Sequence, residues 1–142
     1  FKDTTFLGLY AMGCLNYASQ FIKHRGFTSA DVIWYLFTSW SLRKYLPDKG
    51  FMVVNLVIGA CDHVLAGRLR VEGFDEDKIR GILMDALNMK LAYFLFRLKE
   101  GSISDDMRKG ALEVIDKLAE LLRELGRGEE AEKISDLKRL FT

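Results

Sequence analysis

Apolar positions recur at helical spacing along most of the chain and predict five or six helices. The first helix is expected from about Thr4 to Lys23, and Gly26 is a suitable C-terminal stop. Its apolar residues form one stripe, and polar residues gather on the opposite side, so the helix is amphipathic. The stripe consists of Phe6, Tyr10, Gly13, Tyr17 and Phe21.

A second helix is predicted to begin after the cap residue Thr28 and to run to about Leu46, just before Pro47. Its apolar residues surround the whole circumference, so the domain or a partner has to cover every side. They are Val32, Ile33, Trp34, Tyr35, Leu36, Phe37, Trp40 and Leu42.

The segment from Phe51 to about Leu69 suits either a strand or a helix, because it contains several β-branched residues. A helix is favoured, since no alternation continues after Gly59 and no partner strand is evident.

Three further helices are predicted, at about 75–99, 104–125 and 129–140. The first has two apolar faces, and the second confines its apolar residues to about one-third of its circumference. Because the connecting loops are short, we expect antiparallel neighbours. The sequence therefore predicts one all-α domain over residues 1–142, a largely antiparallel bundle of five to six helices. An aromatic-rich half (1–71) would precede an amphipathic helical hairpin half (72–142).

The segment 121–131 resembles one helical hairpin of the tetratricopeptide type. No 34-residue repeat accompanies it, so no array is inferred.

The amino-acid composition indicates the class of protein and the cellular compartment. The 142 residues are 49% apolar and 29% charged, as in a globular domain. Two cysteines, Cys14 and Cys61, do not make a disulfide scaffold, and we expect a cytoplasmic protein. One glutamine and three asparagines among many charged residues are typical of a thermophilic source. No apolar run reaches the roughly 18–20 residues that span a bilayer.

The acidic pairs Glu113/Asp116 and Glu132/Asp136 resemble the pattern with which all-α nucleotide pyrophosphatases hold Mg²⁺. On the helix predicted at 104–125, however, the acidic residues point away from the apolar face and lie beside lysines and arginines. No enzyme activity is therefore predicted, and this pyrophosphatase is the enzyme class that the chain approaches most closely. The solvent-facing acids are Glu113, Asp116, Glu120 and Glu124.

No metal site and no cofactor are predicted from the cysteines and histidines. Cys61 and His63 lie two residues apart, so a helix would point them about 200° away from each other.

Residues 28–36, 38–39 and 42–46 resemble the helix-turn-helix of excisionase and MerR-type regulators, and 47–54 could begin a wing. Phe37 stands where the turn usually has glycine, and the spacing is one residue short. A continuous helix explains the segment with fewer departures. A DNA-binding regulator over residues 28–54 is thus one alternative.

A small helical subunit of a nucleoprotein complex, such as that of a CRISPR effector, is a second alternative, similar in fold and size only. Nucleic-acid binding would need a continuous basic strip. The residues that could supply it are Arg43, Lys44, Arg68, Arg70, Lys90 and Arg97.

Residues 134–141 resemble the sliding-clamp-binding box, with Ile134 in place of the usual glutamine. Matches of this length arise in any amphipathic helix, so plain packing is the favoured interpretation.

The preferred hypothesis is a non-enzymatic helical module for protein–protein interaction, as a homo-oligomer or as a small subunit of a larger assembly. The aromatic load before residue 51 and the apolar circumference of residues 28–46 support it. Truncating Trp34 and Trp40 is expected to break an assembly before it breaks the fold. The expected partner contacts are Trp34, Tyr35, Phe37 and Trp40, with Tyr10 and Tyr17 as neighbours.

Overall fold

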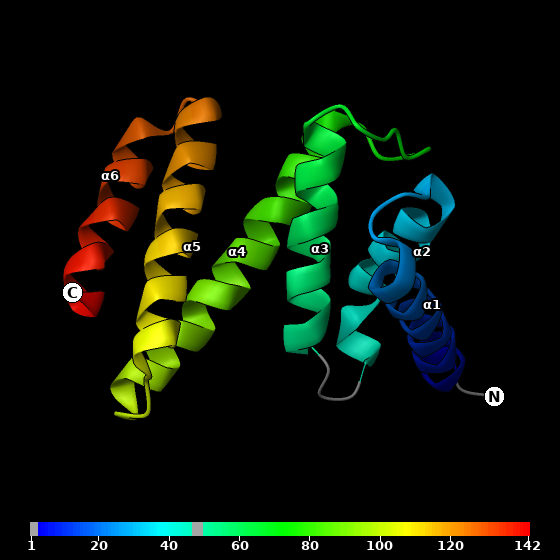
Figure 1. Ribbon diagram of the computed structural model, residues 1–142, viewed down its shortest axis with the longest axis horizontal. Helices are drawn as coiled ribbons and strands as arrows, with labels where there is room; N and C mark the ends of the chain where they lie inside the picture. Colours follow the sequence, from blue (N-terminus) through cyan, green and yellow to red (C-terminus); the bar gives the residue numbers. More distant parts are fainter. Residues whose placement is uncertain (1–2, 47–49) are drawn as a thin grey trace. The chain divides into compact units, whose positions relative to one another are not determined.

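The computed structural model describes residues 3–46 and 50–142, with side chains described for 5–46 and 53–142. Every regular element among these residues is helical, which confirms the predicted all-α class (Figure 1). The segment with the ambiguous pattern is the helix α3. The α-helices are α1 (Asp3–Arg25), α2 (Ala30–Ser41), α3 (Gly50–Leu65), α4 (Glu76–Lys99), α5 (Asp105–Glu124) and α6 (Gly128–Asp136). Two 3-10 helices, η1 (Arg43–Tyr45) and η2 (Leu137–Phe141), follow α2 and α6.

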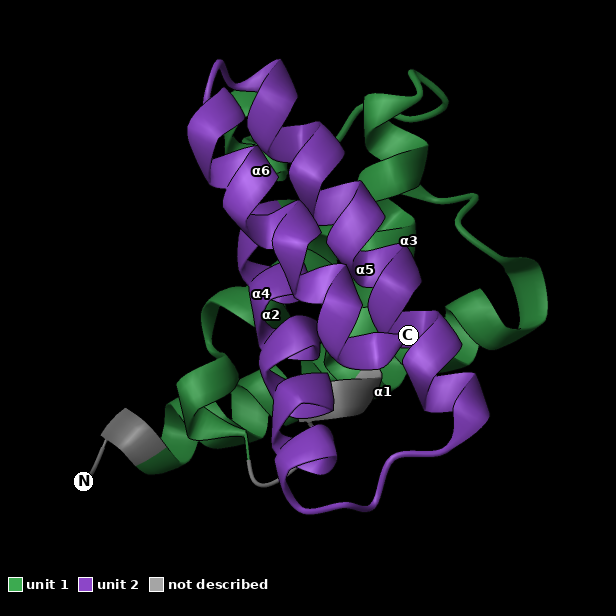
Figure 2. Ribbon diagram, turned by 90° about the vertical axis from the view of Figure 1, so that its left-hand side faces the viewer, with its two compact units in different colours: residues 1–83 green, residues 84–142 purple. Residues whose placement is uncertain are grey.

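The chain divides into two compact units, and the boundary falls inside α4, after Leu83 (Figure 2). Unit 1 contains α1, α2, α3 and the first part of α4. Unit 2 contains the rest of α4 with α5, α6 and η2.

In unit 1, α1 packs against α2 through small and aliphatic side chains. The cap of α2 is Ser29 rather than Thr28, because the Val32 amide donates to Ser29 Oγ at 3.3 Å. Phe37 of α2 lies 5.1 Å, ring to ring, from Phe74. The residues that α1 buries are Ala11, Cys14, Leu15, Ala18 and Ile22. The corresponding residues of α2 are Val32, Ile33, Leu36, Phe37, Ser39 and Trp40.

In unit 2, α5 and α6 lie side by side and run antiparallel, so the predicted hairpin is present (Figure 1). Ser104 caps α5, because its Oγ accepts from the Met107 amide at 3.2 Å. Phe141 of η2 is buried, and the C-terminal segment therefore packs within the chain. The core face of α5 consists of Ala111, Val114, Ile115, Leu118, Ala119, Leu121 and Leu122.

Over the described part of the chain, no helix combines the length and the apolar character that crossing a membrane requires.

Candidate partner-docking surface

The outer side of α1 is aromatic and uncharged over most of its length, up to the basic last turn. Between Thr5 and Ile22 the sequence contains no Asp, Glu, Lys or Arg. Because the helix packs inward through alanines, Cys14 and aliphatic residues, its large rings remain outside. Leu9 is 71% exposed and Tyr17 is 53% exposed, and Phe6 and Tyr10 are exposed as well. Four of the five residues of the predicted stripe are thus exposed, and Phe21 is half-buried. The prediction that polar residues lie on the opposite side was wrong, because Asn16 and Gln20 are exposed beside the stripe.

Two residues of α2 extend this face. The rings of Tyr17 and Tyr35 are perpendicular, with centroids 5.3 Å apart, and Trp34 meets Tyr35 at the same distance. At the other end of α1, Phe6 and Tyr10 stack at 6.3 Å. We call this set the aromatic surface. It comprises Phe6, Leu9, Tyr10, Tyr17, Trp34 and Tyr35.

A groove of about 440 Å³ opens in the aromatic surface. Gly13 forms part of its lining, and a Cβ atom built there would meet no atom within 4 Å. The groove is therefore open at Gly13 and lies between larger side chains. Its lining residues are Leu9, Tyr10, Gly13, Cys14, Tyr17 and Tyr35.

Cys14 lies almost fully buried in the lining of the groove. Burial raises the pKa of its thiol, although a hydrogen bond with Tyr10 acts in the opposite direction. The pKa of Tyr10 is raised too, chiefly by the neighbouring Cys14. Both groups therefore stay protonated at neutral pH, whereas a reactive cysteine needs a thiolate. This arrangement suits packing better than nucleophilic chemistry.

The structure brings together four of the six residues expected to contact a partner: Trp34, Tyr35, Tyr10 and Tyr17. Phe37 is fully buried and Trp40 is only 2% exposed, so both belong to the core of unit 1. Arg43 lies over the Trp40 ring, with 4.1 Å between its guanidinium carbon and the ring centroid. Phe6 and Leu9 were not among the expected contacts. The absence of charge from Thr5 to Ile22 is the signal that could have identified them.

The six basic residues proposed for nucleic acid do not form one strip within either unit. Arg43 Nη1 donates to the Trp40 carbonyl at 2.9 Å, and Arg97 bonds to Ser102 and Tyr93. Lys90 is half-buried in unit 2, and burial lowers the pKa of its amine. Arg43, Lys44, Arg68 and Arg70 lie in unit 1, and Lys90 and Arg97 lie in unit 2.

The geometry of a helix-turn-helix with a wing is also missing from the described residues. The helix α2 continues without a break through Thr38. Val53 and Val54, which would belong to the wing, are buried within α3. The first residues of that predicted wing, 47–49, lie outside the described part of the chain.

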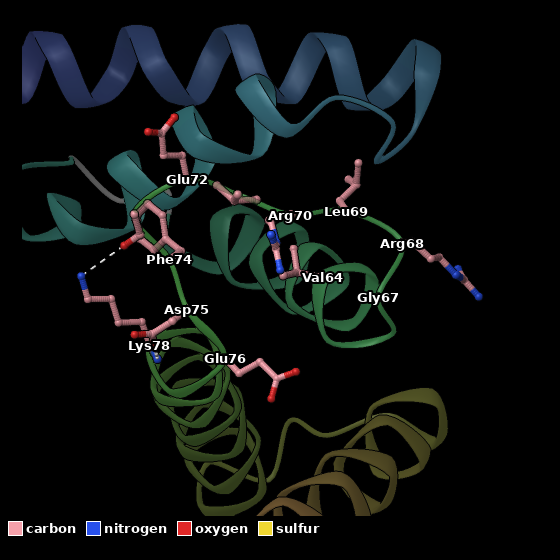
Figure 3. Close-up of a pocket in the computed structure, with 12 residues that line it drawn as sticks. Val64, Gly67, Arg68, Leu69, Arg70, Glu72, Phe74, Asp75, Glu76 and Lys78 are labelled. Atoms are coloured by element: carbon pink, nitrogen blue, oxygen red, sulfur yellow. Dashed lines mark hydrogen bonds between the residues drawn. The ribbon is translucent and has the colours of Figure 1, made fainter.

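A second cavity, of about 950 Å³, lies at the loop between α3 and α4 and is shown in Figure 3. Charges of both signs line it, including Arg68, Arg70 and Glu72. Local interactions already use part of this lining: Asp75 caps the Lys78 amide at 2.9 Å, and Lys78 Nζ donates to the Gly73 carbonyl at 3.1 Å. This mixed lining selects no single class of ligand.

The acidic residues of α5 do not converge on an ion. Glu113, Asp116, Glu120 and Glu124 are all exposed, as the helical pattern predicts. Within the residues that the structure describes, no three His, Cys, Asp or Glu side chains are grouped so as to hold a metal.

No family model, no curated protein and no solved structure matches this chain. The aromatic surface and its chemistry are therefore the basis on which a function can be inferred.

Proposed function

We propose that this protein is a non-enzymatic helical interaction module whose aromatic surface binds another protein subunit. One observation carries the proposal: Phe6, Leu9, Tyr10, Tyr17 and Trp34 are exposed, and the ring contacts and groove described above place them on one face.

The size of this surface supports the proposal. A large aromatic side chain offers about 150–250 Å², so these exposed fractions correspond to about 500 Å² of mainly apolar area. Patches of this size are among the largest that monomeric proteins expose, and they often have a function. Tyrosine and tryptophan are also enriched among the residues that carry the energy of protein–protein binding.

The proposal also includes a cytoplasmic location and a thermophilic source. Both Cys14 and Cys61 are buried, which agrees with a cytoplasmic protein that has no use for a disulfide. A thermophilic source remains a prediction from composition.

Gel filtration of extract from the source organism, carrying the tagged full chain at its native level, tests the proposal. We expect the wild-type chain to elute well above its 16.3 kDa monomer mass. The double variant Tyr17→Ser, Trp34→Ser should elute as a monomer, because it removes two rings of the aromatic surface without touching the core. Circular dichroism should show that its fold is retained.

Phe96→Ser is the matched control. Phe96 belongs to unit 2 and is more than half exposed, like Phe6. We expect this variant to elute with the wild type. Elution of the wild-type chain at its monomer mass, or loss of the assembly in the control alone, would contradict the proposal.

A further inference from the structure

We infer that the partner seated on the aromatic surface is a second copy of this chain, docked about a two-fold axis with the two α1 helices antiparallel. This inference rests on the proposed function and specifies its partner.

The first observation is a matching projection and hollow on one face of α1. Among the side chains of unit 1 that the structure describes, Leu9 is the most exposed large apolar one, and Gly13 opens the groove beside it. The two residues are one helical turn apart, about 6 Å along the axis. If a two-fold axis crosses α1 at the level of Ala11, Leu9 of each copy meets Gly13 of the partner subunit. A two-fold interface needs a surface that is complementary to itself, and this spacing supplies it.

Gly13 has no internal reason to be glycine. Two other helical glycines have close neighbours: a Cβ at Gly8 would lie 3.2 Å from the Tyr45 carbonyl oxygen, and one at Gly59 would lie 2.6 Å from Phe27 Cζ. Gly81, like Gly13, has none. At Gly13 nothing lies within 4 Å. Glycine weakens a helix interior, so an external contact that needs the space explains its presence better than packing within the chain.

The second observation is the spacing of the exposed positions. Exposed residues of α1 recur three or four apart, the spacing with which two helices pack along a seam. No charge lies on this seam between Thr5 and Gln20, so two copies meet there without like-charge repulsion. The basic residues Lys23, His24 and Arg25 are exposed in the last turn of α1, beyond this stretch. The exposed positions within it are Thr5, Phe6, Leu9, Tyr10, Gly13, Asn16, Tyr17 and Gln20.

The available area fits a second copy. Two aromatic surfaces of about 500 Å² each would bury about 1,000 Å² of mainly apolar area. Stable interfaces begin near 1,200 Å² in total, and the polar residues Asn16 and Gln20 add to the rim. We therefore expect a dimer of modest affinity, with a Kd in the micromolar range.

Sedimentation velocity on the purified full chain, over about 1 to 100 µM, tests the inference. The wild type should shift from the 16.3 kDa monomer toward twice that mass. Gly13→Leu should weaken the dimer by about tenfold or more, because its side chain fills the space that Leu9 of the partner subunit needs. Gly81→Leu is the matched control, since Gly81 is also an exposed helical glycine with nothing within 4 Å. It should dimerise like the wild type.

Cysteine cross-linking tests the register. A mixture of Leu9→Cys and Gly13→Cys chains should form a disulfide-linked heterodimer on mild oxidation, at a higher yield than either variant alone. A strictly monomeric wild type at the highest concentration overturns the inference. The proposed function survives that result if the extract still contains a larger assembly, since a different subunit then occupies the surface. A dimer that Gly13→Leu leaves unchanged also overturns the inference.

Discussion

The outer faces of α1 and α5 differ in kind, although both helices bury one side. The outer face of α5 carries exposed acids, and its ion pairs reach the neighbouring elements: Lys138 pairs with Asp116, and Arg123 lies 3.8 Å from Glu132 of α6. Between Thr5 and Ile22, the outer face of α1 carries tyrosine, phenylalanine and leucine and no charge. Charged residues opposite an apolar arc mark a face that water covers. This difference is the basis for our proposal that the outer face of α1 binds a protein partner.

The buried faces of α1 and α5 also differ, in the size of their side chains. This difference explains why the outer face of α1 is aromatic. The core face of α5 consists mostly of leucine, isoleucine and valine, with two alanines, and these side chains fill the space between neighbouring helices. The core face of α1 includes Ala11, Cys14 and Ala18, which allow α2 to approach closely. A close-packed interface of small residues has no room for aromatic rings, so the rings of α1 remain on the surface.

The largest expected effect separates the two sides of α2. Trp40→Ala should destabilise unit 1 by about 3–5 kcal/mol, because it leaves a cavity in the core. Trp34→Ala should destabilise unit 1 by less, about 1–2 kcal/mol, since Trp34 is 38% exposed and loses mainly its contact with Tyr35. Denaturant unfolding measures both effects, and the remaining tryptophan reports on unit 1 alone.

This outcome would replace the expectation from the sequence, in which both tryptophans contact a partner. Equal destabilisation by the two variants would mean that Trp34 is as important to the core as Trp40. It would contradict the assignment of Trp34 to an exposed side of α2.

A second prediction compares glycines of the two units. Gly59→Ala should destabilise unit 1 by about 1–3 kcal/mol, because its Cβ would approach Phe27 Cζ to 2.6 Å. Gly110→Ala in unit 2 meets Phe94 Cζ at 3.1 Å, and a gain in helix propensity of about 1 kcal/mol offsets the crowding. We expect the second variant to stay within about 1 kcal/mol of the wild type. Thermal unfolding followed by circular dichroism ranks the two, and the reverse order would contradict the packing described for α3.

The smallest expected effect concerns the half-buried Lys90 of unit 2. Burial lowers the pKa of its amine, nearby Lys117 acts in the same direction, and Glu113 opposes both. Between the lowered folded pKa and the ordinary lysine pKa, the unfolded chain binds more protons, so stability rises with pH across this window. Below the window the penalty for the buried charge is fully present. Lys90→Met should therefore stabilise the protein at pH 7 by at most about 1 kcal/mol.

That gain should shrink as the pH rises through the window, which unfolding curves at several pH values would show. Lys109→Met replaces an exposed lysine of α5 and serves as the control. A gain that does not depend on pH, or one that the control shares, would indicate added apolar contact instead of a removed burial penalty.

Local patterns in the sequence were sufficient for the elements of unit 2. The apolar arc of residues 107–125 predicts the helix and its buried face, because charged residues mark the opposite side. The short loop after Leu125 predicts the hairpin with α6. Segment 51–69 was ambiguous by pattern. It is helical in the structure as far as Leu65, since buried valines suit a packed helix as well as a strand.

The sequence by itself determined the helical class, the amphipathic hairpin and the excess of aromatic residues in the first half of the chain. Only the tertiary structure decided which aromatic residues lie outside. Asp31, Thr38 and Ser41 lie three, four and seven positions from Trp34 and fall on its side of the helix. Because apolar residues surround the whole circumference, these few polar residues were not enough to separate Trp34 from Trp40 by pattern. Their difference depends on where α1 and Phe74 pack, which is a matter of contacts between distant segments. Tertiary packing likewise decides which side of α1 is buried. Its small residues pack against α2, and this leaves the aromatic surface on the outside.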